Sequence, residues 1–157
     1  MSTKVHAIAR KGRMGNYAYG LTLFLLALTG FAQMPIFKRY YIADIPGFGW
    51  LAEFYTTHFI HYLAATAILA ITTYFAVQYL LVTRRYQRLS RTGTARAVIL
   101  SGIIASGILL VIRNSVFVPF SPAVVTVLLL VHMGLTMVFL LFALYCKLSG
   151  RPWTVSV

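Results

Sequence analysis

Four long apolar stretches constrain the fold of this chain more than any other feature of its sequence. They cover approximately residues 17–37, 57–82, 97–117 and 123–145. A helix needs about 20 apolar residues to cross the ~30 Å hydrocarbon core of a bilayer, and each stretch is long enough to do so. Inside lipid every backbone N–H and C=O must be satisfied within the segment, which favours helices over isolated strands. The sequence therefore predicts one all-α domain, residues 1–157, built as a four-helix transmembrane bundle.

The composition supports lipid as the solvent of this chain. Hydrophobic residues make up 60% of it and charged residues only 10%, whereas a soluble domain of this length needs more charge to cover its surface. The formal net charge of +12 could suggest nucleic acid as a partner. However, the cations form short clusters between the apolar stretches, so we expect contact with membrane lipid and none with nucleic acid.

The distribution of lysine and arginine predicts the orientation of the bundle, because cytoplasmic loops carry an excess of these residues. We expect both termini and the middle loop, residues 83–95, in the cytoplasm, and the other two loops outside. The basic N-terminus resembles a secretory signal, but the apolar stretch behind it is too long and no A-x-A site follows, so we expect an uncleaved first span. The cations on the expected inner side are Lys4, Arg10, Lys11, Arg13, Arg84, Arg85, Arg88, Arg91, Arg96, Lys147 and Arg151; those on the outer side are Lys38, Arg39 and Arg113.

The first outer loop, residues 38–56, is rich in aromatic side chains and contains both acids of the chain, Asp44 and Glu53. Trp50 and several tyrosines surround a turn-forming Pro46-Gly47-Phe48-Gly49 segment. This composition is typical of an aromatic belt at the membrane interface. It is also suited to docking an outer partner, and the two interpretations are compatible. We interpret the two carboxylates as solvated loop charges rather than a catalytic pair.

Three histidines lie within or next to the apolar stretches, where an ionisable residue usually marks a functional site. His61 and His132 are expected at similar depth, on helices that run in opposite directions. Two neutral imidazoles that face each other across a bundle match the axial ligands of six-coordinate haem iron. The ordinary alternative is a buried histidine that bonds a neighbouring carbonyl. His58 lies one turn from His61 on nearly the same face, so we expect it to bond a haem propionate or a group next to the ligands.

Arg113 lies at the outer end of the third apolar stretch and has two interpretations of equal weight. It is a second candidate partner for a haem propionate. Alternatively, it is an interface cation whose stem lies along apolar surface while its head reaches water.

Short segments of the chain resemble the membrane cytochrome b subunits of formate dehydrogenases and nickel–iron hydrogenases. In the first helix of that family an arginine is followed three residues later by a haem-ligating histidine and fourteen residues after that by the glycine of a Ser/Thr-Gly pair. Arg13 and Thr29-Gly30 match this frame, but Asn16 occupies the histidine position.

Two further segments carry the resemblance. Phe59-Ile-His61-Tyr-Leu-Ala-Ala65 resembles the second ligand segment of the family, with an alanine where a glycine is usual. Leu130-Val-His132-Met resembles the third ligand segment. The fourth ligand, fourteen residues further on, corresponds to Cys146. The ligands of the family's outer haem are therefore kept, and both ligands of its inner haem are replaced.

The resemblance implies a single haem b on the outer side, with His61 and His132 as its ligands. Cys146 is then a small buried apolar residue; the alternative is that its sulfur holds an unusual inner haem. The implied function is an electron-transfer subunit, rather than a catalyst on its own, in a respiratory complex of a bacterial or archaeal cytoplasmic membrane. Electrons would pass between an outer-face iron–sulfur or multihaem cytochrome subunit, the haem and a quinone.

Two other classes of function compete with this one. The first is a haemless membrane anchor for a redox or other peripheral complex. The second is a small transporter or channel, which usually needs intramembrane charge, broken helices or repeats. The sequence offers little of these, so we favour the cytochrome.

Overall fold

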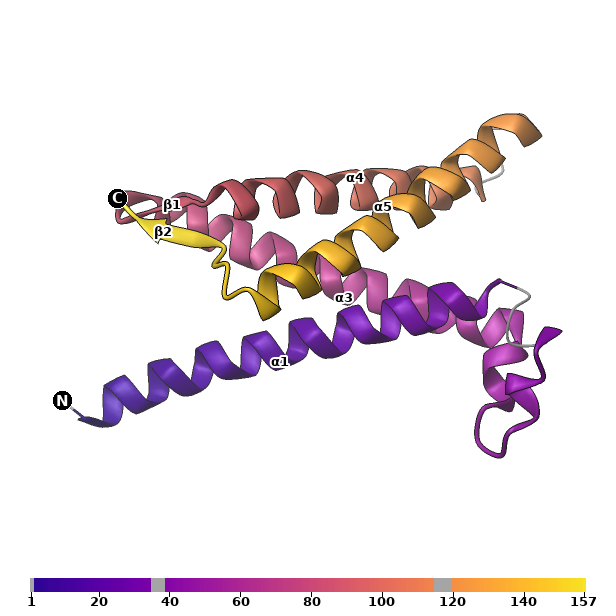
Figure 1. Ribbon diagram of the computed structural model, residues 1–157, viewed down its shortest axis with the longest axis horizontal. Helices are drawn as coiled ribbons and strands as arrows, with labels where there is room; N and C mark the ends of the chain where they lie inside the picture. Colours follow the sequence, from indigo (N-terminus) through magenta and orange to yellow (C-terminus); the bar gives the residue numbers. More distant parts are fainter. Residues whose placement is uncertain (1, 35–38, 115–119) are drawn as a thin grey trace. The chain divides into compact units, whose positions relative to one another are not determined.

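The computed structural model describes residues 2–34, 39–114 and 120–157, and within these ranges the side chains from Gly15 onward. The chain divides into two compact units, Met1–Val77 and Gln78–Val157. Helices dominate both units, and Figure 1 shows their order along the chain. Each unit is described in turn.

The first unit contains helix α1 (Ser2–Ala32), two short 3-10 helices, η1 (Ile42–Asp44) and η2 (Gly49–Ala52), and most of helix α3 (Phe54–Leu81). Helix α1 begins far before residue 17, where the apolar stretch begins, because the preceding segment is rich in Ala, Lys and Arg and contains no proline. These residues have high helix propensity. The basic segment that precedes the first apolar stretch is therefore helical as well.

Helices α1 and α3 form an antiparallel pair. A Cβ placed on Gly15 would lie 3.3 Å from Cζ of Phe75, and one placed on Gly30 would lie 3.3 Å from Cε1 of His61. Residues later in α1 therefore contact residues earlier in α3, so the two helices run in opposite directions. Glycine at these two points lets the side chains of α3 approach the backbone of α1 closely.

The second unit contains the end of α3, a 3-10 turn η3 (Thr83–Arg85), strand β1 (Gln87–Leu89), helices α4 (Arg91–Arg113) and α5 (Pro122–Leu148), and strand β2 (Thr154–Ser156). Helices α4 and α5 are also antiparallel, since Gly102 lies against Leu135 and Gly107 against His132. Both helices begin at a serine cap. The Ser90 side chain accepts a hydrogen bond from the Gly93 N–H, and Ser121 does the same for Val124.

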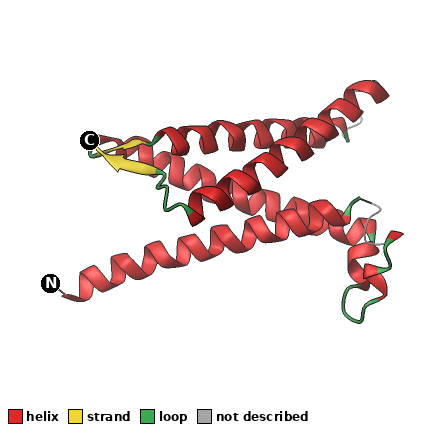
Figure 2. Cartoon of the chain, viewed as in Figure 1, coloured by secondary structure: helices red, strands yellow, loops and turns green. Residues whose placement is uncertain are grey.

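Strands β1 and β2 pair antiparallel, with Arg88 opposite Val155. Figure 2 shows this small sheet, the one departure from helix and loop in the described part of the chain. The described chain is otherwise mostly helical, as the sequence predicted, and the middle loop is shorter than predicted because α4 begins at Arg91. Each strand is only three residues long, too short to produce a recognisable alternating pattern.

A buried arginine ties the C-terminal segment to α4. The Arg96 guanidinium donates hydrogen bonds to the carbonyl oxygens of Arg151 (3.2 Å) and Pro152 (2.9 Å). Its Nε donates to the Thr92 carbonyl within the helix. A side chain at Gly93 would collide with the Trp153 carbonyl, so the segment lies directly on the first turns of α4.

Three of these helices, α3, α4 and α5, are long and apolar enough to cross a membrane. They correspond to the second, third and fourth apolar stretches of the sequence. Large apolar side chains such as Phe59, Leu63, Val98 and Leu141 point outward from them, which is expected where the solvent is lipid. Helix α1 is basic in its first half and apolar in its second half. Its role as a fourth span, and the inward orientation of both termini, stay predictions.

Candidate functional site

The His61 side chain, on α3, is held by a buried threonine of α1. Its Nδ1 lies 3.0 Å from Oγ1 of Thr29, which is 0% exposed. The threonine hydroxyl donates its own hydrogen to the Leu25 carbonyl at 2.6 Å. Because that hydrogen is already used, Oγ1 accepts from the imidazole, and Nδ1 carries the proton. A neutral imidazole protonated on Nδ1 has its lone pair on Nε2.

His132, on α5, has an equivalent setting in the second unit. Its Nδ1 lies 2.9 Å from Oγ of Ser106 on α4, which is 5% exposed. The serine hydroxyl donates to the Ile103 carbonyl at 3.0 Å. Nδ1 of His132 is therefore also the donor, and its Nε2 also carries the lone pair in the neutral ring.

A glycine follows the hydroxyl residue in both settings and packs against the same edge of the ring. A Cβ on Gly30 would lie 3.3 Å from Cε1 and 3.8 Å from Nδ1 of His61, and a Cβ on Gly107 would meet His132 at the same two distances. The two units thus repeat one local arrangement: a hydroxyl–glycine pair on the first helix and a histidine on the second. Sequence reasoning noticed Thr29-Gly30 through the resemblance but missed Ser106-Gly107. The third apolar stretch contains two hydroxyl–glycine pairs, Ser101-Gly102 and Ser106-Gly107, and the sequence alone does not show which of them faces a histidine.

His58 lies one turn from His61 and bonds an amide rather than a hydroxyl. Its Nδ1 is 3.0 Å from Oε1 of Gln33, whose Nε2 donates to the Thr29 carbonyl at 3.3 Å. The ring also stacks on Phe54, with centroids 5.2 Å apart. Gln33 was not foreseen from the sequence. His58 and His61 on α3 therefore bond two polar residues at the end of α1, Gln33 and Thr29, that lie one turn apart. The propionate role of His58 stays a prediction.

The other predicted site residues have simpler surroundings. Arg113 is the last residue of α4 and its side chain is exposed, and Asn16 on α1 is also exposed. Cys146 on α5 is fully buried, as expected for a small apolar residue. Within the described ranges, no three His, Cys, Asp or Glu side chains gather as a metal cluster; axial ligation of a haem needs only two histidines.

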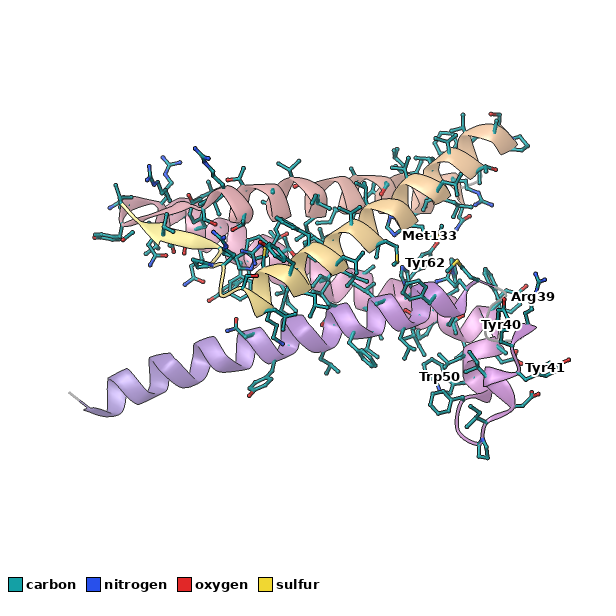
Figure 3. The ribbon with its side chains drawn as sticks, in the orientation of Figure 1. Arg39, Tyr40, Tyr41, Trp50, Tyr62 and Met133 are labelled. Carbon is teal, nitrogen blue, oxygen red and sulfur yellow. The ribbon has the colours of Figure 1, made fainter. Side chains whose placement is uncertain are left out.

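The loop between α1 and α3 presents aromatic side chains to its surroundings. Tyr40 and Tyr41 are strongly exposed, and Figure 3 shows Tyr41 and Trp50 on opposite sides of this loop. Leu51 of η2 is buried and anchors the loop. An exposed aromatic loop fits both expectations, an interface belt and a docking surface.

In both His61 and His132, Nδ1 donates a hydrogen bond to a hydroxyl oxygen of the neighbouring helix. Nε2, which carries the lone pair, is the atom of each ring that could ligate a metal. Comparison of the chain with protein-family models gave no match, and comparisons with curated proteins and with solved structures gave none either. Function is therefore inferred from the residues and their contacts.

Proposed function

We propose that this chain is a b-type cytochrome subunit that binds one haem through Nε2 of His61 and Nε2 of His132. The observation that carries the proposal is the matched pair of hydroxyl–imidazole bonds, Thr29–His61 and Ser106–His132. Histidines that ligate a metal characteristically donate their other ring N–H to a protein acceptor, which fixes the tautomer and the ring orientation. Two neutral imidazoles prepared in this way fit the axial positions of haem iron.

The bound haem would supply one-electron redox chemistry. The chain's own residues hold the two ring tautomers, and the apolar helices keep water away from the rings. Membrane insertion with both termini in the cytoplasm agrees with the eleven cations expected on the inner side. We propose that electrons pass between an outer-face iron–sulfur or multihaem cytochrome subunit and the quinone pool, in a bacterial or archaeal cytoplasmic membrane.

A stoichiometry of one haem follows from the resemblance to the cytochrome b subunits of formate dehydrogenases and nickel–iron hydrogenases. In that family two further histidines hold an inner haem, and here Asn16 and Cys146 stand in their places. The buried position of Cys146 agrees with an apolar role for this residue.

A pyridine haemochrome assay with protein quantitation on the purified full-length chain tests the proposal. One protohaem per chain is expected, His61→Ala and His132→Ala should each abolish binding, and His58→Ala should leave the haem bound. A haem-free wild-type protein, or a haem that survives both ligand substitutions, would overturn it. Two haems per chain would show that Asn16 and Cys146 were misinterpreted.

A haemless membrane anchor is the second candidate, and one observation favours it. Tyr40, Tyr41 and Tyr55 are all strongly exposed around the loop between α1 and α3, as expected of a surface that docks a peripheral partner. An anchor would show no Soret absorbance and would keep its complex intact after His61→Ala.

A further inference from the structure

We infer that Thr29 and Ser106 are positioning residues: each orients one axial histidine and raises the electron density at its Nε2, so that together they lower the reduction potential of the iron. The inference rests on the proposed haem. It concerns two hydroxyl groups that do not touch the iron, and its test separates their role from haem binding itself.

The direction of the two hydrogen bonds gives the mechanism. The Thr29 hydroxyl donates to Leu25 at 2.6 Å and accepts from His61 at 3.0 Å. In such a chain each hydrogen bond polarises the next, and the effect is stronger where the local dielectric is low. The partial negative charge on Oγ1 draws the Nδ1 proton and leaves the imidazole a better donor at Nε2. A more basic ligand stabilises ferric over ferrous iron, which lowers the potential.

Burial makes these hydroxyl groups reliable as fixed acceptors. Thr29 is 0% exposed and Ser106 is 5% exposed, so water does not compete readily for either oxygen. Each hydroxyl is also anchored by a carbonyl of its own helix, Leu25 or Ile103. The orientation of each ring is therefore determined by the first helix of its own pair.

The close glycine contacts restrict the rings further. With the backbone of Gly30 or Gly107 against Cε1 on one edge and the hydroxyl at Nδ1, a ring that turns about its Cβ–Cγ bond loses its hydrogen bond. The angle between the two imidazole planes should therefore depend on Thr29 and Ser106.

The chain offers matched controls for both hydroxyl residues. Thr22 on α1 donates to the Ala18 carbonyl, and Ser101 on α4 donates to the Ala97 carbonyl, and both hydrogen bonds are exposed. Substitution of these residues removes the same hydroxyl type from the same helix without removing a bond to a histidine.

The experiment compares Thr29→Val with Thr22→Val, and Ser106→Ala with Ser101→Ala, in the purified full-length protein. Haem content, the midpoint potential from a spectroscopic redox titration, and the largest EPR g value, which reports the angle between the imidazole planes, are measured for each. We expect Thr29→Val and Ser106→Ala each to shift the potential upward, to change the g value and to weaken haem retention by about 10–100-fold. The two controls should match wild type, and Thr29→Ser and Ser106→Thr should restore wild-type values.

The outcomes distinguish a failure of the proposed haem binding from a failure of the positioning role of Thr29 and Ser106. A wild-type protein without haem defeats the proposed function. One haem per chain with unchanged potential and g value in both Thr29→Val and Ser106→Ala defeats the positioning role alone. If Thr29→Val loses its haem entirely, retention in Thr29→Ser and Thr22→Val supports the role, whereas equal loss in Thr22→Val contradicts it.

Discussion

The guanidinium carbon of Arg96 lies 4.2 Å from the centre of the Trp153 ring. The side chain is 5% exposed, and the unit that contains it, Gln78–Val157, has no Asp or Glu in its sequence. The positive charge is therefore stabilised by carbonyl dipoles and by the π face of the tryptophan rather than by a carboxylate. This one residue joins the start of α4 to the segment that leads into β2.

Arg96→Lys should release that segment. Lysine keeps the charge but lacks the planar fork that reaches two carbonyl oxygens at once. Hydrogen bonds to a charged group contribute about 1.5–3 kcal/mol each, so a loss of stability of that order is expected. Chymotrypsin should cut at Trp153 faster than in wild type, while Arg91→Lys, at an exposed position of the same helix, should cut at the wild-type rate. Equal rates in the two variants would contradict the role given to Arg96.

Gly30→Ala and Gly107→Ala should each disturb the neighbouring histidine. The new methyl group would lie 3.3 Å from Cε1 of the histidine ring. The ring cannot move aside without weakening its hydrogen bond at Nδ1. Overpacking of this kind costs about 1–3 kcal/mol. Thermal unfolding in detergent measures the effect.

Gly20→Ala and Gly134→Ala are the matched controls, since a Cβ at either position meets nothing within 4 Å. Each should be neutral or should stabilise its helix by about 0.5–1 kcal/mol. Destabilisation of all four variants to the same extent would show that the contact with the histidine is irrelevant.

Cysteine labelling should place the two ends of α3 on opposite sides of the membrane. Cys146→Ala gives a background without thiols, because Cys146 is the single cysteine of the chain. With the cytoplasmic orientation proposed for both termini, Tyr40→Cys should react with an impermeant maleimide in intact cells, and Arg88→Cys should react only after permeabilisation. The opposite pattern would reverse the orientation, and labelling of both positions in intact cells would exclude α3 as a span.

The sequence predicted the apolar helices well because length and hydropathy alone determine them. The apolar stretch at residues 57–82 corresponds to helix Phe54–Leu81, and the one at residues 123–145 corresponds to helix Pro122–Leu148. Local signals determine where such helices begin. In α5 the signal is Ser121-Pro122, a capping serine followed by proline at the first helical position. The small sheet was missed because β1 and β2 are stabilised by pairing between distant segments rather than by local pattern.

The site was predicted only in part, for a similar reason. His61 and His132 were recognisable because ionisable residues are rare in apolar stretches. Their hydroxyl partners were not, because Thr29 and Ser106 are ordinary residues in membrane helices, and only the packing of two helices shows which serine or threonine faces a ring. Gln33, which holds His58, was hidden in the same way.

The hydroxyl and the histidine that it orients belong to the same pair of consecutive helices in both units. Each ring can therefore be aligned as soon as its own two helices have associated during synthesis, with no contribution from the other half of the chain. In the proposed cytochrome, a porphyrin that arrives after translation would meet imidazoles that are already oriented to bind its iron. Little side-chain entropy would then be lost on binding, since each freely rotating side chain costs about 0.5–1.5 kcal/mol to immobilise.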